Sequence, residues 1–152
     1  MIDLRIEKAA PDDIGRLAPL FLGYLRFYHK TVAPEAAMRF LEERLRQNQS
    51  TVFLAILDGR AIGFVQLYPC FASLSLAPSW VLNDLFVEED ARGLGVAEAL
   101  MQAARQLAES NGAAEVFLQT ARSNAVAQRL YERLGYRRDD EFLVYTLSLP
   151  RP

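Results

Sequence analysis

The sequence has little of what several protein classes require. Its 152 residues include one cysteine, Cys70, and one histidine, His29, so an internal disulfide is excluded and no metal site is expected. No run of about 18 uncharged apolar residues could span a bilayer, and residues 1–10 carry charges where a leader peptide is apolar. The 17 basic and 19 acidic side chains leave a formal net charge of -2, which gives no strong attraction for nucleic acid or an anionic membrane. We therefore expect a cytoplasmic protein with neither of these partners.

What is present fits one ordinary globular domain. The chain is 51% hydrophobic and 24% charged, with 8 glycines and 7 prolines, which is far from disordered or fibrous compositions. A chain of this length can bury a sizeable core. We expect a single domain over residues 1–152.

Apolar periodicity divides the chain into strands and helices. Period-two alternation or short apolar runs indicate strands, and spacings of three and four indicate helices. The expected strands are 1–8, 51–57, 61–68, 80–87, 114–119 and 141–149, and the expected helices are 12–28, 34–47, 94–110 and 124–134. This order predicts an α/β or α+β fold, with a mixed sheet of six or seven strands and helices on its faces.

The segment between the strand 80–87 and the next helix is rich in glycine. It reads Arg92-Gly93-Leu94-Gly95-Val96-Ala97. Glycine lets a backbone approach a ligand closely, and a helix start presents free amides and a positive dipole end, so the turn suits a pyrophosphate. A tight loop made of glycine for steric reasons is the alternative. A dinucleotide fingerprint is excluded because Glu98 stands where its third glycine belongs, and no Gly-Lys-Ser/Thr tripeptide supports a nucleotide hydrolase.

The same six residues match a family signature. They fit the acetyl-CoA motif Arg/Gln-x-x-Gly-x-Gly/Ala of the GNAT N-acetyltransferase superfamily, which the chain resembles over nearly its whole length. A second block, from Asn124 through Ala127, Leu130 and Tyr131 to Tyr136, is similar to that family's second cofactor motif. The resemblance implies an acyl-CoA N-acyltransferase fold with a mostly antiparallel central sheet.

The resemblance also implies a cofactor and its contacts. Acetyl-CoA is the expected co-substrate, with its pantetheine against the strand end 85–87 and its pyrophosphate on the amides of 93–97. Asn124 is expected to touch it from the next helix. The implied cofactor-binding residues are Leu85, Phe86, Val87, Arg92, Gly93, Leu94, Gly95, Val96, Ala97, Asn124 and Tyr131.

Acetyl transfer to an amine needs an acid and a base. By resemblance, Tyr131 protonates the departing thiolate, although its spacing also suits a core aromatic. Asp84 is the first candidate for the base and for binding the amine, and Glu115 is the second. A solvated carboxylate or a partner of a nearby arginine remains the alternative for Asp84.

Aromatic side chains gather at the end of the first helix. Tyr24 and Tyr28 are the expected substrate-binding residues there, because ring faces hold a cationic amine; core packing explains Tyr28 equally well. His29 is more typical of a surface helix cap. The run 82–87 resembles the diamine and small-amine branch of the family, which commonly carries glutamate where this chain has Asn83.

These observations predict an acetyl-CoA-dependent N-acetyltransferase. Its acceptor is expected to be a small primary amine that attacks directly in a ternary complex. A non-catalytic acyl-CoA-binding sensor and a protein or peptide N-acetyltransferase are the alternatives. A covalent relay through Cys70 is disfavoured, since no histidine lies nearby in the sequence. The apolar last strand would suit a homodimer as well as a core.

Overall fold

The computed structural model describes residues 2–152, so Met1 of the first expected strand lies outside the described residues. Contacts divide the chain into two compact units, one that ends at Gln119 and one from Thr120 to Pro152. Each unit is described by itself. The expectation of a single domain over 1–152 stays a prediction.

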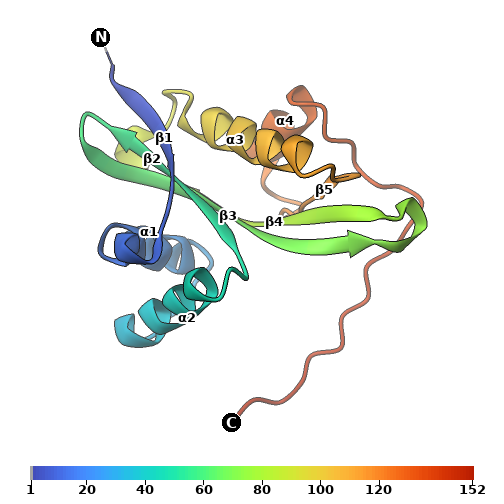
Figure 1. Cartoon of the computed structure of the whole chain (residues 1–152), viewed down its shortest axis with the longest axis horizontal. Coiled ribbons are helices and arrows are strands. Elements are labelled where there is room, and N and C mark those ends of the chain that lie inside the picture. Colours follow the sequence, from blue (N-terminus) through green and yellow to red (C-terminus); the bar gives the residue numbers. More distant parts are fainter. Residues whose placement is uncertain (1) are drawn as a thin grey trace. The chain divides into compact units, whose positions relative to one another are not determined.

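The first unit contains an open five-stranded sheet with the order β1-β2-β3-β4-β5 (Figure 1). Neighbouring strands from β1 to β4 are antiparallel, and β4 and β5 are parallel, so the mixed and mostly antiparallel sheet is confirmed. The sheet has fewer strands than the expected six or seven. The strands are β1 (Leu4–Lys8), β2 (Thr51–Leu57), β3 (Arg60–Ala72), β4 (Ala77–Val87) and β5 (Val116–Phe117).

The hairpin between β2 and β3 follows from its turn residues. Asp58 and Gly59 have φ angles of 49° and 84°, and two positive φ angles are what a tight hairpin turn with the correct twist requires. Aspartate and glycine are among the few residues that adopt this backbone conformation at low cost. The expected hairpin is therefore confirmed, although β3 continues past Tyr68 to Ala72.

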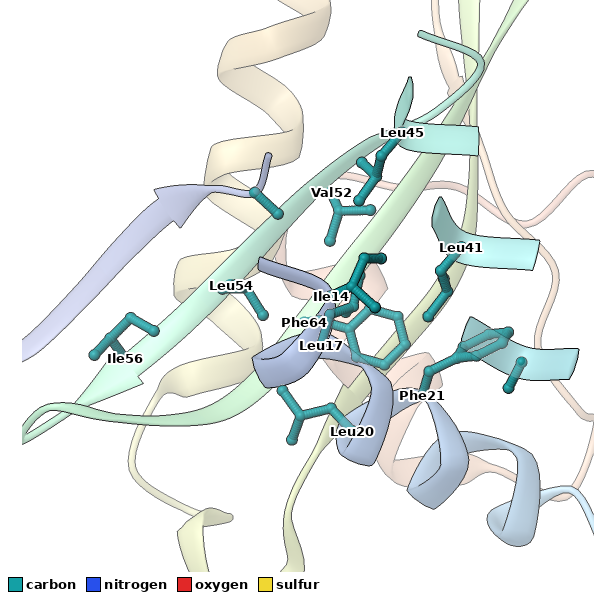
Figure 2. Packing of buried hydrophobic residues seen from close by; sticks show 12 residues of the cluster. Ile14, Leu17, Leu20, Phe21, Leu41, Leu45, Val52, Leu54, Ile56 and Phe64 are labelled. Carbon is teal, nitrogen blue, oxygen red and sulfur yellow. The ribbon is translucent and has the colours of Figure 1, made fainter. Parts of the chain in front are cut away.

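Helices cover both faces of the sheet. The helices α1 (Ile14–Phe27) and α2 (Pro34–Arg46) enclose an apolar cluster against β2 and β3, seen in Figure 2. On the other face lies α3 (Val96–Ser110), whose Leu100 lies beside Gly63 of β3. The cluster under α1 and α2 includes Ile14, Leu17, Leu20, Phe21, Leu41, Leu45, Val52, Leu54, Ile56 and Phe64.

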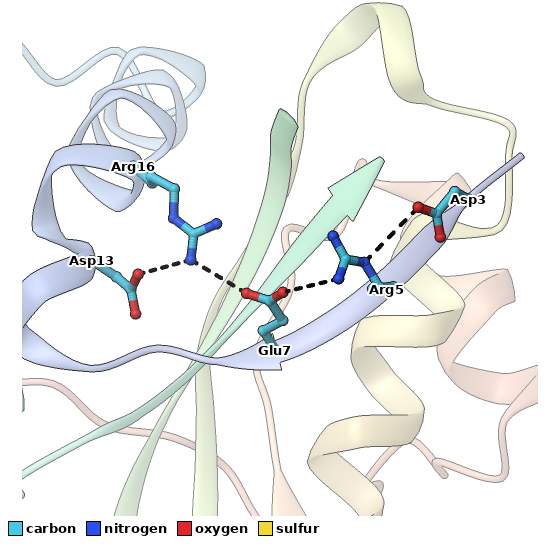
Figure 3. A network of polar contacts seen from close by, with 5 residues as sticks. All are labelled: Asp3, Arg5, Glu7, Asp13 and Arg16. Carbon is cyan, nitrogen blue, oxygen red and sulfur yellow. Dashed lines mark hydrogen bonds and ion pairs between the residues drawn. The ribbon is translucent and has the colours of Figure 1, made fainter. Parts of the chain in front are cut away.

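A polar network joins β1 to the start of α1 (Figure 3). The Arg16 guanidinium lies 2.7 Å from Asp13 and 3.3 Å from Glu7, and the same Glu7 lies 3.9 Å from Arg5. Asp13 also accepts the Ala10 amide at 2.8 Å, and these contacts lower the pKa of its carboxyl. Because the ion pairs are solvent-exposed, they add little stability and chiefly fix where the first helix begins.

The second unit contains α4 (Ala125–Arg133). The expected strand 141–149 is wrong, because those residues have no strand partner in the described chain, and Leu143, Tyr145, Leu147 and Leu149 are 71–87% exposed. Alternating apolar residues favour a strand, but a strand forms only where another backbone pairs with it. The expected strand 114–119, in the first unit, is likewise reduced to Val116–Phe117.

Among the described residues, no helix is both long enough and apolar enough to cross a membrane.

Two glycines of the first unit should respond in opposite ways to alanine. A Cβ on Gly63 would lie 2.9 Å from the carbonyl oxygen of Phe86, so Gly63→Ala should destabilise the fold by about 1–3 kcal/mol through overpacking. A Cβ on the helical Gly15 meets nothing within 4 Å, and Gly15→Ala should be neutral or stabilising by up to about 1 kcal/mol. Urea unfolding measures both, and equal midpoints for the two variants would contradict this account of packing.

Candidate functional site

The glycine-rich turn lies between the end of β4 and the start of α3. Gly93 and Gly95 have φ angles of 80° and 81°, and a Cβ on either would meet nothing within 4 Å. The turn therefore needs glycine for its left-handed backbone, and the steric alternative is not supported. Gly95 is the N-cap of α3 and has no side chain to bond the amides of the first helical turn. An open, positively polarised helix start is the arrangement that suits a phosphate group.

Arg92 of the same turn is held by the neighbouring elements. Its Nε donates to the carbonyl oxygen of Val87 at 2.9 Å, and its guanidinium lies 6.0 Å from the ring centre of Phe27 and 5.8 Å from that of Phe86. The motif arginine thus connects the turn with the end of α1 and with β4. Its hydrogen bond to Val87 and its contacts with the two rings hold the turn in place.

One edge of β4 is open beside the turn. Strand β5 pairs with β4 only at Trp80 and Val81, whereas β3 pairs with β4 as far as Val87. In the described chain, the stretch 82–87 therefore has a strand on one side only. Leu85 and Phe86, which the resemblance assigned to the cofactor, lie half-buried on this stretch. An open strand edge offers backbone donors and acceptors to a ligand with amide groups.

Asp84, the candidate base, is buried in the middle of this sheet. Only 3% of its surface is exposed. Its Oδ1 accepts a hydrogen bond of 2.7 Å from Nδ2 of Asn83, and its Oδ2 accepts one of 2.5 Å from Nε2 of Gln66. The hydroxyl of Tyr24 lies close enough to act on the carboxyl as well. The two alternative interpretations of Asp84, a solvated carboxylate and a partner of an arginine, are therefore wrong.

A β-bulge arranges the groups around Asp84. Gln66 pairs with Asp84 and Leu67 pairs with Leu82, so Asn83 is an extra residue in β4. Bulges re-aim side chains and are frequent beside functional sites. The carbonyl oxygen of Asn83 accepts the Tyr24 hydroxyl at 3.3 Å. The bulge thus connects β4 to α1 at the position of the buried acid.

The electrostatics of the site follow from its burial. Burial raises the pKa of Asp84 above its usual value, although the hydrogen bonds from Asn83, Gln66 and Tyr24 act in the opposite direction. Burial and the Asp84 charge together raise the pKa of Tyr24, and they raise the pKa of Tyr68 to about 12. No arginine or lysine of the described chain forms an ion pair with Asp84. The site is an acid without a counter-ion.

Aromatic rings cluster around Tyr24, the neighbour of this acid. The Tyr24 ring lies 5.1 Å from that of Tyr28 and 6.0 Å from that of Phe64, measured between centroids. Tyr28 is 45% exposed, and Phe27 beside it is 51% exposed, so the core interpretation of Tyr28 is wrong. Tyr24 therefore lies beside Asp84 and against Tyr28, and the ring faces of both tyrosines suit a cationic amine.

The residues of the second motif lie in the second unit. Asn124 is the N-cap of α4, where its Oδ1 accepts the amide of Ala127 at 3.2 Å. Tyr131 is half-buried on this helix, with its ring centre 6.1 Å from that of Tyr136. Asn124 therefore has a structural role in its own helix. The cofactor contact of Asn124 and the acid role of Tyr131 stay predictions.

The other candidates lie outside the buried site. Glu115, the second candidate base, is exposed, and its carbonyl oxygen accepts the backbone amide of Trp80. His29 follows α1 as an exposed residue with a φ angle of 59°, and Cys70 is an exposed free thiol. Within residues 2–152 no group of three or more His, Cys, Asp or Glu side chains is placed to hold a metal ion.

Sequence reasoning missed Gln66 and Tyr68. A signal for Gln66 was available, because it is the one side chain in the run 61–68 that is neither apolar nor aromatic nor glycine. A polar residue inside a buried strand needs a hydrogen-bond partner, and that partner is Asp84. No sequence signal separates Tyr68 from an ordinary strand aromatic.

Comparison with known proteins gives consistent results. The sequence model of the Acetyltransferase (GNAT) family matches residues 18–136. An uncharacterized N-acetyltransferase of Bacillus subtilis, YhfO, is 40% identical over 147 residues, which cover 97% of this chain and 99% of that protein. A probable acetyltransferase of Haemophilus influenzae is 34% identical over 151 residues, which cover 96% and 99% of the two chains. A crystal structure of a probable acetyltransferase has a TM-score of 0.92 and 44% identity, with 97% and 99% covered.

The family match extends over most of the chain, and the relatives align along nearly their whole length. The chain therefore belongs to the GNAT acetyltransferase family, and it is an acetyl-CoA-dependent N-acetyltransferase.

Proposed function

We propose that this enzyme acetylates a primary amine of a small molecule by direct attack of the amine in a ternary complex. The observation that carries the proposal is the buried carboxylate of Asp84, which accepts two hydrogen bonds from neutral amides and has no cation of the described chain beside it. A protonated amine supplies the missing charge. The rings of Tyr24 and Tyr28 offer it aromatic surface at the same place.

Asp84 solves the main difficulty of the reaction. An alkyl amine with a pKa of about 10.4 is neutral in roughly one molecule in 2,500 at pH 7, which corresponds to about 4.6 kcal/mol. The Asp84 carboxylate first binds the ammonium as its counter-ion and then accepts its proton. Burial raises the pKa of Asp84 and so brings its proton affinity closer to that of the amine. The nitrogen lone pair is then free to attack.

Acetyl-CoA, when bound, supplies a thioester whose carbonyl carbon accepts the amine nitrogen. We assign its pyrophosphate to the backbone amides of residues 93–97 and to Arg92, because both glycines leave open space there. We assign its pantetheine to the open edge of β4 at Leu85, Phe86 and Val87. Asn124 completes this set from α4.

Tyr131 is the proposed acid. Its hydroxyl gives a proton to the sulfur as the carbon–sulfur bond breaks, so a free thiol leaves instead of a thiolate. The attacking nitrogen loses a second proton as the amide forms, and this proton restores the Tyr131 hydroxyl. The proton accepted by Asp84 is released to solvent after the amide product departs. We further expect the enzyme to act in the cytoplasm and to form a homodimer.

Replacing the acid should abolish turnover without unfolding the protein. Asp84→Asn keeps the shape of the side chain but cannot accept the amine proton, so kcat/KM should fall by about 10²–10⁴-fold. In the wild type, kcat/KM should rise with pH as Asp84 loses its proton. This rise should be absent from Asp84→Asn. Thiol release from acetyl-CoA measures both, with polyamines, aminoglycosides, amino acids and peptides as acceptors.

The same assay contains its controls. Glu115→Gln removes an exposed carboxylate and should leave turnover within about twofold, because the side chain lies outside the buried site. The thermal midpoint of Asp84→Asn should not fall, since a buried charge is removed.

Acetylation of peptides with no transfer to small amines would overturn the proposed substrate class. Full turnover by Asp84→Asn would overturn the proposed base.

The glycine turn allows a matched test of the cofactor assignment. Asparagine tolerates a positive φ, so Gly95→Asn should fold, but its side chain would fill the space assigned to the phosphates. Gly112 at the other end of α3 has a φ angle of 73° and equally open surroundings, so Gly112→Asn carries the same backbone change away from the turn. Calorimetry should show at least about tenfold weaker coenzyme A binding for Gly95→Asn alone. Equal affinities for the two variants would contradict the assignment.

A further inference from the structure

One atom beside Asp84 has no partner. Gln66 is completely buried, and its Nε2 donates to the carboxylate, but its Oε1 accepts no hydrogen bond. In the described chain only Ser50 has another buried side-chain oxygen or nitrogen of this kind. Buried acceptors in folded proteins are nearly always satisfied, so each exception indicates a missing donor.

The orientation of the Gln66 amide is fixed by its neighbour. If the amide were turned by 180°, Oε1 would face an ionised carboxylate oxygen, which repels it. Nε2 therefore stays on Asp84, and Oε1 is the atom left over. No described residue satisfies it: Asn83 donates to the other carboxylate oxygen, and Tyr24 donates to the carbonyl of Asn83.

The two acceptors are spaced for a single nitrogen, although Oε1 has no exposed surface in the free protein, so the amine must displace a neighbouring side chain to reach it. The oxygen and nitrogen of an amide are roughly 2.2 Å apart. Since Nε2 lies 2.5 Å from Oδ2 of Asp84, Oε1 lies within about 4.7 Å of that oxygen. Two N–H···O bonds of about 2.9 Å from one tetrahedral nitrogen place their acceptors about 4.7 Å apart. An ammonium group has the three N–H donors and the positive charge that this pair of acceptors lacks.

We propose that Gln66 is a substrate-binding residue whose Oε1 accepts an N–H of the acceptor amine while Asp84 binds its charge. This inference rests on the proposed function, since it places the amine beside Asp84. After Asp84 has taken one proton, a neutral primary amine keeps two N–H groups. One of them stays on Gln66 and holds the nitrogen while its lone pair attacks. The pocket thus selects amines with N–H donors over cations that have only charge.

Two simple cations test this selection. Butylammonium and butyltrimethylammonium carry the same charge and chain, but only the first has N–H donors. Their affinities are measured by NMR titration of the protein with coenzyme A present, which prevents turnover. The wild type should bind butylammonium more tightly. In Gln66→Met its affinity should fall roughly 10- to 100-fold, the usual effect of losing a hydrogen bond to a charged group. The affinity for butyltrimethylammonium should not change.

A second variant keeps the shape of the side chain. Gln66→Glu keeps an acceptor where Oε1 lies, and its other oxygen shares a proton with Asp84 in place of the Nε2 hydrogen bond, so it should retain the preference for butylammonium. If Gln66→Glu instead behaves like Gln66→Met, the acceptor at Oε1 is not what selects the amine, and the proposal is overturned. Gln66→Met with an unchanged preference overturns it as well, as does a wild type without any preference. Thermal midpoints establish that each variant is folded.

Failure of the proposed function gives a different result. Asp84→Asn should weaken the binding of both cations, because both depend on its charge. If Asp84→Asn leaves both affinities unchanged, the amine does not bind at Asp84, and the proposed function fails whatever Gln66 does. If Asp84→Asn weakens both and Gln66→Met changes neither, the role of Asp84 stands and that of Gln66 is overturned.

Discussion

The extra residue in β4 determines the geometry on which the site depends. Gln66 and Phe64 lie on the face of β3 that α1 covers, and their partners in β4 are Asp84 and Phe86. Because Asn83 is inserted before Asp84, the regular alternation of β4 is interrupted there. The bulge carbonyl accepts the hydroxyl of Tyr24 and so connects β4 to α1.

Burial of one carboxylate then connects structure with chemistry. A charged group removed from water lowers stability unless it is paired, and Asp84 has neutral donors but no cation. Neutral donors leave the carboxylate a stronger base than a salt bridge would. The glycine turn and the open edge of β4 also lower stability, because both leave backbone groups available to a ligand. Stability is thus reduced at both places where substrates are expected to bind.

Local patterns predicted much of the fold. The period-two alternation near the start, the Asp58-Gly59 turn and the helical spacings all predicted elements that the structure contains. Patterns failed where pairing with another backbone decides the outcome: 141–149 alternates like a strand but has no partner, and β5 is only Val116–Phe117. Asp84 and Tyr24 were predicted for the site, whereas Gln66 was not. Its role depends on a cross-strand register that no local pattern contains.

The most direct test is a titration of Asp84 by carboxyl carbon NMR, with its signal assigned by comparison with Asp84→Asn. The account predicts a midpoint above the usual aspartate value of about 3.9 in the free protein, because the group is buried without a cation. Binding of butylammonium should lower this midpoint, since an adjacent positive charge favours the ionised form. An ordinary midpoint in the free protein that does not move when the amine is added would contradict the central claim.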